Sequence, residues 1–168
     1  MRLDGAIACG LFFAVVMWMP GIAGKRAVDR QAAGAGAVDV CALLPRDEVS
    51  KILGRNIGRA RPQTRSDGPA ECRYSGGLRG TITVIVGTGT TKSKWDAFIK
   101  ELKDSGAPLE PVAGVGDGAY FWDDNRLYAH AGGHQVTVST STAPGTSGEK
   151  LRADALALAK VVIGKLKR

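Results

Sequence analysis

The feature that most constrains this chain is a mostly apolar run from Gly5 to Met19, which ends at Pro20. Gly21 and Ala23 follow the run and supply the small side chains that signal peptidase accepts before its cleavage site. The run is shorter than the roughly 20 residues that a membrane-spanning helix needs, which disfavours an uncleaved anchor. These features predict a signal peptide over residues 1–23 and an exported protein, located in the periplasm or outside the cell.

The cysteines are typical of an exported chain, because thiols oxidise in such compartments. Cys9 lies inside the predicted signal peptide, which leaves Cys41 and Cys72. We expect these two residues to form a disulfide that closes a loop of about 31 residues and stabilises the fold by about 3–4 kcal/mol. Two buried free thiols are the alternative. Two cysteines and two distant histidines lack the spacing of a metal site, so we expect no metal and no cofactor.

The residues after the signal peptide divide into a leader and one domain. Residues 24–37 are small, polar or charged, and they predict a flexible leader in which positions 34–37 offer a later cleavage site. Residues 38–168 have the usual length of a single domain. The whole chain has 23 Lys and Arg against 16 Asp and Glu, which gives a net charge of +7. A basic protein of this kind favours anionic partners.

Hydrophobic periodicity and turn residues predict helices and strands along residues 38–168. Pro45 is favourable at a helix start and Gly54 at a helix end, while Trp95, Phe98 and Ile99 lie on one face of a second helix that starts at a Ser93 cap. The predicted helices cover residues 45–53, 93–105 and 149–166, and the predicted strands cover residues 57–61, 71–74, 81–86, 119–122, 127–131 and 135–139. Because the strands do not alternate singly with helices, we expect an α+β fold. Its mostly antiparallel sheet should carry helices packed on it, in the order α-β-β-β-α-β-β-β-α.

Two predicted hairpins fix which side chains share a face of the sheet. A turn at Gly132-Gly133 places the two histidines on opposite faces, so they cannot share a metal ion. A turn at Asp124-Asn125 places Phe121 opposite Tyr128, on the same face as His130. This aromatic face could stack on a sugar or a peptide. Alternatively, a helix or the leader could cover it.

The strongest surface signal in the sequence is basic. Arg55, Arg59, Arg61 and Arg65 are all odd-numbered, so in an extended segment they project to one side. Guanidinium groups bind phosphates and carboxylates through two parallel hydrogen bonds. The stripe therefore predicts a surface for an anionic envelope component, and a membrane surface is one such partner. A charged edge strand that resists aggregation is the alternative. No aromatic residues interleave with these arginines, which disfavours nucleic acid as a partner.

Three short motifs are spread over most of the chain after the predicted signal peptide. They are Asp39-Val40-Cys41-Ala42-Leu43-Leu44 followed by Val49 and Leu53-Gly54, then Cys72-Arg73-Tyr74, and finally Pro111-Val112-Ala113-Gly114-Val115-Gly116-Asp117-Gly118-Ala119-Tyr120. Together they resemble a group of bacterial exported proteins of unknown function, many of which are lipoproteins. The resemblance implies a disulfide and an α+β fold, and it implies no activity. A lipid anchor is not implied, because the signal end lacks a cysteine of the lipobox type.

The sequence supports three hypotheses about function. The first, which we favour, is a non-catalytic binding module of the cell envelope with no transmembrane helix in the mature chain. It would engage an anionic or a protein partner through the arginines or the aromatic face. The second is a small hydrolase-type enzyme that uses Asp117 and His130, although the chain has no Gly-x-Ser-x-Gly motif. The third is an inhibitor or adaptor that binds another exported protein through the sheet.

Overall fold

The computed structural model describes residues 38–63, 68–76, 80–141 and 145–168, so the predicted signal peptide and leader lie outside the described residues. The helices are α1 (Val40–Leu43), α2 (Arg46–Leu53), α3 (Lys92–Asp104) and α4 (Gly148–Leu166). The strands are β1 (Ala60–Gln63), β2 (Ala70–Ser75), β3 (Thr81–Thr88), β4 (Glu110–Pro111), β5 (Gly118–Asp123), β6 (Arg126–Ala131) and β7 (His134–Thr140). None of the helices described here is long and apolar enough to cross a membrane.

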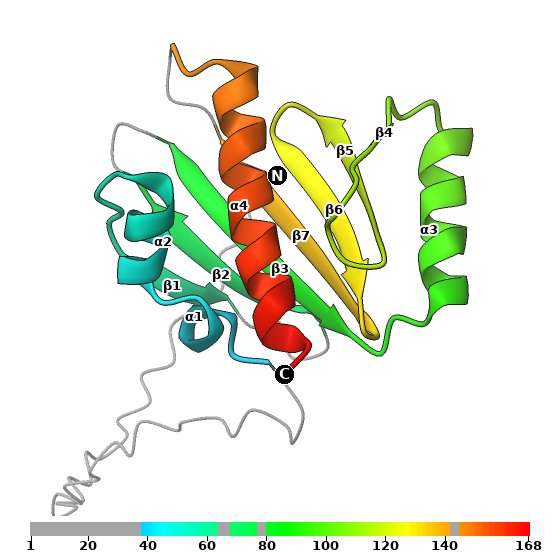
Figure 1. Ribbon diagram of the computed structural model, residues 1–168, viewed down its shortest axis with the longest axis horizontal. Helices are drawn as coiled ribbons and strands as arrows, with labels where there is room; N and C mark the ends of the chain where they lie inside the picture. The colour runs from blue at the N-terminus through cyan, green and yellow to red at the C-terminus, as the bar shows by residue number, and fades with distance from the viewer. Residues whose placement is uncertain (1–37, 64–67, 77–79, 142–144) are drawn as a thin grey trace, which may run out of the picture. The chain divides into compact units, whose positions relative to one another are not determined.

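The strands form one antiparallel sheet in the order β1-β2-β3-β7-β6-β5-β4 (Figure 1). Its centre joins β3 to β7, and the chain between these two strands contains α3 and the strands β4, β5 and β6 of the second half of the sheet. The predicted α+β class and the antiparallel sheet are therefore confirmed. The element order differs from the predicted one by the short α1 and the two-residue β4.

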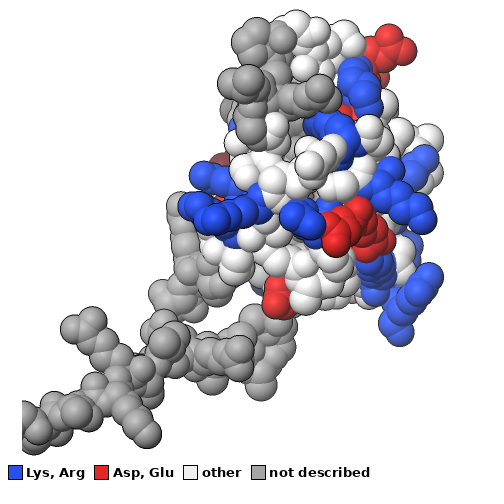
Figure 2. Space-filling view, turned by 90° about the vertical axis from the view of Figure 1, so that its left-hand side faces the viewer, with Lys and Arg blue, Asp and Glu red and all other residues white. Residues whose placement is uncertain are grey.

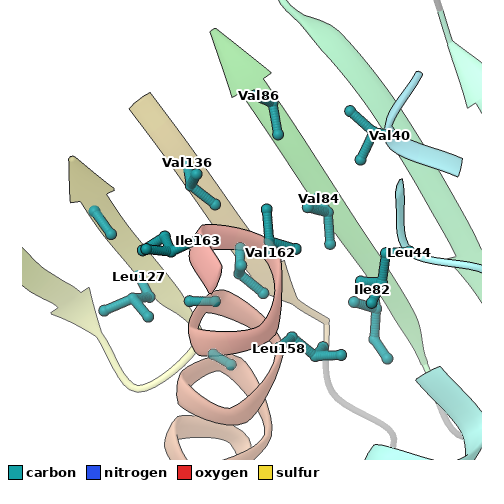
Figure 3. Close-up of a cluster of buried hydrophobic side chains, with 14 of the residues drawn as sticks. Val40, Leu44, Ile82, Val84, Val86, Leu127, Val136, Leu158, Val162 and Ile163 are labelled. Carbon is teal, nitrogen blue, oxygen red and sulfur yellow. The ribbon is translucent and has the colours of Figure 1, made fainter. Parts of the chain in front are cut away.

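Helix α4 packs across the first face of the sheet and covers the main core (Figure 1). Leu158 and Val162 of α4 lie in one buried cluster with Val84, Val136 and Leu127, which come from β3, β7 and β6 (Figure 3). Side chains alternate between the two faces of a strand, so the neighbours of these residues lie on the second face. That second face carries most of the residues considered below.

Local sequence explains where the longer helices begin and end. Helix α2 follows Pro45 and ends at Gly54, whose φ of 61° is the left-handed conformation that glycine adopts without strain. The side chain of Thr91 caps α3 by accepting a hydrogen bond from the backbone N–H of Lys94. The sequence predicts the cap at Ser93, and the structure places it two residues earlier. Threonine satisfies the free N–H groups of the first turn as serine would.

The two hairpins of the sheet differ in their agreement with prediction. The β6–β7 hairpin has the predicted register. The β5–β6 hairpin has the predicted turn, because Asp123 lies opposite Arg126. A bulge between Phe121 and Asp123 then shifts the pairing by one residue, and Phe121 lies opposite Leu127 instead of Tyr128. An extra residue in one strand moves every side chain beyond it to the other face of the sheet.

This shift makes the predicted pair of Phe121 and Tyr128 wrong. Phe121 is buried in the main core, where the Arg152 guanidinium of α4 lies 4.3 Å from the centre of its ring. Tyr120 instead lies opposite Tyr128 on the second face. The aromatic face therefore exists, but the bulge changes which residues of β5 belong to it.

Helix α3 packs on the second face, over β5 and β6. Its residues Trp95 and Ile99 are buried with Tyr128 in a second apolar cluster. The ring of Phe98 meets the Tyr128 ring edge-on, with 5.2 Å between the two centroids. Farther across the sheet, Ile85 of β3 is only partly buried on this face. The part of the second face that belongs to β2, β3 and β7 is thus accessible.

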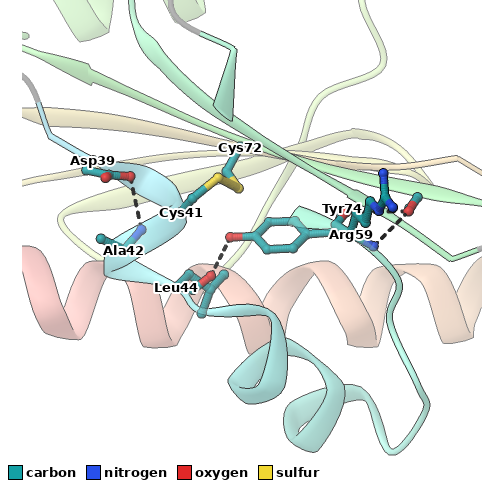
Figure 4. The surroundings of a disulfide bond; sticks show 8 residues. Asp39, Cys41, Ala42, Leu44, Arg59, Cys72 and Tyr74 are labelled. Carbon is teal, nitrogen blue, oxygen red and sulfur yellow. Dashed lines mark hydrogen bonds between the residues drawn. A yellow bond between two sulfur atoms is a disulfide. The ribbon is translucent and has the colours of Figure 1, made fainter. Parts of the chain in front are cut away.

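A disulfide joins Cys41 of α1 to Cys72 of β2, as predicted, with their Cα atoms 5.2 Å apart (Figure 4). Beside it, the buried Tyr74 hydroxyl donates a hydrogen bond of 2.5 Å to the carbonyl of Leu44, just after α1. Helix α1 has four residues, too few to be stable alone. The disulfide and the tyrosine therefore hold this segment on the first face.

Replacing Tyr74 by Phe should destabilise the protein by about 1–3 kcal/mol at neutral pH, because the buried carbonyl of Leu44 loses its donor. Burial, with smaller contributions from the charges of Asp39 and Glu48, raises the pKa of the Tyr74 hydroxyl above its ordinary value of about 10. Above that pH, tyrosine ionises in the unfolded chain and stays neutral in the fold, so stability falls as the pH rises. Urea unfolding should show a smaller alkaline loss in Tyr74→Phe than in the unmodified protein. Equal losses would contradict this account.

Candidate functional site

Alternation along the strands brings five basic and hydroxyl-bearing residues together on the second face. They are paired in register from one strand to the next, in the order Arg61, Arg73, Thr83, Ser139 and Arg126, on β1, β2, β3, β7 and β6. We call this set the arginine row. Directly paired residues have Cβ atoms about 4.5–5.5 Å apart and point to the same side. Three strand spacings separate Arg73 from Arg126, which is about 14 Å.

Among the described residues, the neighbours of the arginine row neutralise only part of its positive charge. Arg61 and Arg73 are both exposed and lie directly opposite each other, an arrangement in which like charges repel. A salt bridge from Glu71 to Arg73, with 3.6 Å between Oε1 and Nη2, balances one of the three guanidinium groups. Lys and Arg side chains also gather on the side of the molecule where α2 and β1 lie, around a smaller acidic patch (Figure 2). The surroundings of the row therefore favour an anion.

An aromatic stack supports Arg126 at the far end of the row. The Arg126 guanidinium lies 5.0 Å from the centre of the Trp122 ring. Trp122 in turn stacks on Tyr128, with 6.1 Å between the ring centroids. Attraction between a cation and an aromatic face restricts the arginine side chain without neutralising its charge. Arg126 is thus held in place and keeps its charge for a ligand.

An open groove on the second face adjoins the arginine row. Its volume is about 540 Å³, which is within the range of small-molecule sites. The side chains of Ile85, Phe98 and Tyr128 form its apolar part, and Arg126 and Ser139 belong to both the groove and the row. The other residues that line it are Pro69, Gly87, Gln135 and Thr137. The groove therefore offers apolar surface and positive charge side by side.

The structure divides the four arginines of the predicted stripe. Arg59 and Arg61 are exposed at β1, as the stripe requires. Arg55 does not lie with them, because its guanidinium is largely buried against Asp154 of α4, with 3.2 Å between Nη2 and Oδ2. The segment just after α2 is not a strand, so the alternation that would align Arg55 with the others is absent there. Arg65 lies outside the described residues.

Helix α3 covers most of the predicted aromatic face. His130 is buried beneath it and stacks on Trp95, with 5.6 Å between the ring centroids. Its Nε2 atom lies 2.8 Å from the carbonyl oxygen of Thr90, just before the helix. Phe121 points into the main core, so among the three predicted aromatic-face residues Tyr128 alone lines the groove. His130 and Phe121 stabilise the packing and do not reach the arginine row.

The Asp117 and His130 pair has the geometry of a structural link. Asp117 Oδ2 lies 3.8 Å from His130 Nδ1, beyond hydrogen-bond distance, and accepts a 3.0 Å hydrogen bond from the N–H of Gly132. This hydrogen bond, together with the charge of Lys167, lowers the pKa of Asp117. Both ring nitrogens of His130 face protein oxygen atoms, so the imidazole is not directed at a nucleophile, as hydrolysis would require. The pair connects the β6–β7 turn to its surroundings, and this geometry does not support the hydrolase hypothesis.

Sequence reasoning missed Arg126 and the groove. The segment 81–86 already places Ile85 on the face opposite Val84 and Val86, which is a signal for an apolar residue on the second face. The contribution of Phe98 depends on where α3 packs, and the local pattern does not contain that information. The groove can therefore be recognised only from the tertiary structure.

Comparisons with protein-family models, with curated proteins and with solved structures find no match for this chain. The resemblance to exported bacterial proteins therefore stays a prediction. Within the described part of the chain, no three His, Cys, Asp or Glu side chains come together as a metal site needs. The geometry of the second face is consequently the basis for assigning a function.

Proposed function

We propose that this protein is a non-catalytic binding module that engages an anionic ligand through the arginine row. The observation that carries the proposal is the direct pairing of Arg61 with Arg73 on an exposed face of the sheet. Like charges on directly paired residues repel each other in the free protein. A phosphate or carboxylate between them would remove the repulsion and accept charge-assisted hydrogen bonds from both.

The middle of the arginine row is suited to the same ligand class. Thr83 and Ser139 lie side by side between the basic ends, and both side chains are partly exposed. Hydroxyl groups donate hydrogen bonds to anionic oxygen atoms without adding a charge. A ligand with more than one anionic group, or with one anionic group and neutral oxygens, could therefore contact several members of the row.

An exported location is part of the proposal. The Cys41–Cys72 disulfide supports it, because such bonds persist mainly in oxidising compartments. The positive net charge of +7 also favours attraction to the anionic polymers and lipid head groups of a cell envelope. The ligand class that we propose is accordingly an anionic component of the envelope.

Retention on immobilised heparin, measured over a series of salt concentrations, tests the proposal. Each cationic contact with a polyanion releases about one bound counterion, so retention falls linearly on a log–log plot against salt. Replacing Arg61 and Arg73 together by Ala should reduce the slope of that plot by about two. Vesicles with anionic head groups should likewise bind the unmodified protein more tightly than the Arg61→Ala/Arg73→Ala variant.

A matched variant controls for net charge. Lys94→Ala with Lys160→Ala removes the same charge from exposed positions on α3 and α4. This control should keep most of the slope, because its lysines do not belong to the arginine row. Equal losses in both double variants, or retention that does not depend on salt, would show that the row is not the binding site. Thermal unfolding of both variants checks that each one is folded.

A further inference from the structure

The groove has an apolar part that a purely ionic ligand would leave in water. Ile85 and Phe98 lie in the groove as partly buried apolar side chains, and they come from β3 and α3. Tyr128 of β6 adds a largely buried ring to this apolar part. Arg126 and Ser139 line the same groove and also belong to the arginine row. Apolar surface and positive charge thus meet within one site.

We propose that the ligand is an amphipathic anion with a single acyl chain. The chain lies against Ile85, Phe98 and Tyr128, and the anionic head meets the arginine row at Arg126 and Ser139. This inference rests on the proposed function, because it assigns a ligand class to the same site. Burial of the chain would remove from water the apolar side chains that the fold leaves partly exposed there.

Charge complementarity selects the sign of the head group. The ring of Trp122 holds the Arg126 guanidinium from one side and contributes no negative charge. Arg73 and Arg61 extend the positive surface across the sheet, and Glu71 contacts Arg73 at the end of the row away from Arg126. A head group at Arg126 therefore meets the charge of Arg126 directly and lies several strands away from Glu71. Asp123 pairs with Arg126, but its carboxylate accepts a hydrogen bond from the N–H of Asn125 and, among the described residues, makes no salt bridge with Arg126. A cationic amphiphile would lack this attraction.

The sheet itself favours an acyl chain over a peptide. Strands β3 and β7 are central, and each one pairs along its length with a neighbour on both sides. Their backbone N–H and C=O groups are therefore used within the sheet and are not available to an added extended peptide. A peptide lying on this face would bring polar backbone groups against apolar side chains. An acyl chain has no such groups to satisfy.

Calorimetric titration of the full chain with hexanoate and with dodecanoate, below the micelle concentration, tests the inference. Both probes carry one carboxylate, and they differ in the length of the chain. Affinity should rise by about tenfold for each two methylene groups that the groove buries. Dodecyltrimethylammonium, which has the same chain with a cationic head, should bind more weakly than dodecanoate. Equal affinities for hexanoate and dodecanoate, or tight binding of the cationic probe, would overturn the inference.

Gly87 allows the groove to be filled without straining the backbone. A Cβ atom built at this glycine would meet its nearest neighbours, on Gln135 and Pro69, at 3.9 Å, an ordinary contact distance. Gly87→Phe should therefore fold normally and abolish the advantage of dodecanoate over hexanoate. Thr81→Phe adds the same ring on the same strand and face, outside the groove, and should keep that advantage.

The outcomes separate this inference from the proposed function. If heparin retention depends on Arg61 and Arg73 while dodecanoate binds no better than hexanoate, the acyl ligand is wrong and the anion-binding function stands. If retention is also independent of the arginines, both proposals fail. A third outcome is that a polyglutamate peptide binds, that Gly87→Phe blocks its binding, and that dodecanoate does not compete with it. The occupant is then an acidic peptide, and the inference is overturned.

Discussion

Replacing Cys41 and Cys72 together by Ser should lower the free energy of unfolding by about 3–4 kcal/mol. The two cysteines are separated by 31 positions in the sequence. The disulfide limits the freedom of the unfolded chain, and the chain-entropy relation for a loop of this length gives that magnitude. It also holds α1, whose four residues could not form a stable helix alone. Without it, the segment that buries Val40 and Leu44 should separate from the core first.

Urea unfolding with and without a thiol reductant measures this effect. The reductant should destabilise the unmodified protein by about the same amount as the double substitution, because both remove the same cross-link. It should leave the Cys41→Ser/Cys72→Ser variant unchanged, which serves as the control. Equal stability of the oxidised and reduced proteins would contradict the prediction. The arginine row lies on the opposite face from Cys72, so heparin retention of the folded variant should persist.

Much of this fold is encoded in signals that operate within a few residues. Pro45 and Gly54 mark the two ends of α2. The alternation of Ile82, Val84 and Val86 with Thr81, Thr83 and Ile85 identifies β3. The Gly132-Gly133 turn fixes the β6–β7 register. In each case the physical cause is local, because proline, glycine and alternation act on the backbone conformation of their own segment. These features could be predicted from the sequence.

The errors share a different cause. The bulge in β5 inserts one residue next to a turn that was itself predicted correctly, and this moves Phe121 into the core and Tyr120 to the second face. Nothing in the short motif distinguishes a bulged strand from a regular one, because the preference arises from packing on both faces. The burial of Phe121 beneath α4 and of Tyr128 beneath α3 illustrates that packing.

The candidate site depends on pairings between distant parts of the chain. Arg61 was predicted as exposed, yet its position opposite Arg73 depends on the pairing of β1 with β2. Arg126 joins the same row through β7, which pairs with both β3 and β6. Strand order is a tertiary property, so the sequence could identify a basic segment but not the row that crosses the sheet.

Replacing Asp154 by Ala should destabilise the protein by about 3–5 kcal/mol, because it leaves the charge of Arg55 without its buried partner. The side chain of Asp154 is 3% exposed and that of Arg55 is 15% exposed, so water cannot easily solvate the charge that remains. Lys150 also contacts Asp154, but its side chain is 53% exposed and can turn toward solvent. Lys150→Met should therefore cost at most about 1 kcal/mol.

A double substitution distinguishes a stabilising ion pair from a buried charge that merely needs a partner. Arg55 Nε and Asp154 Oδ2 lack hydrogen-bond partners among the described residues, so the pair is incompletely satisfied. Arg55→Met with Asp154→Leu should therefore be about as stable as the unmodified protein, or more stable by about 1–4 kcal/mol, in chemical unfolding. A double variant as unstable as Asp154→Ala would show that the ion pair itself stabilises the contact between α2 and α4. In either case heparin retention should depend on Arg61 and Arg73 and not on Arg55, since Arg55 is held against α4 and away from the arginine row.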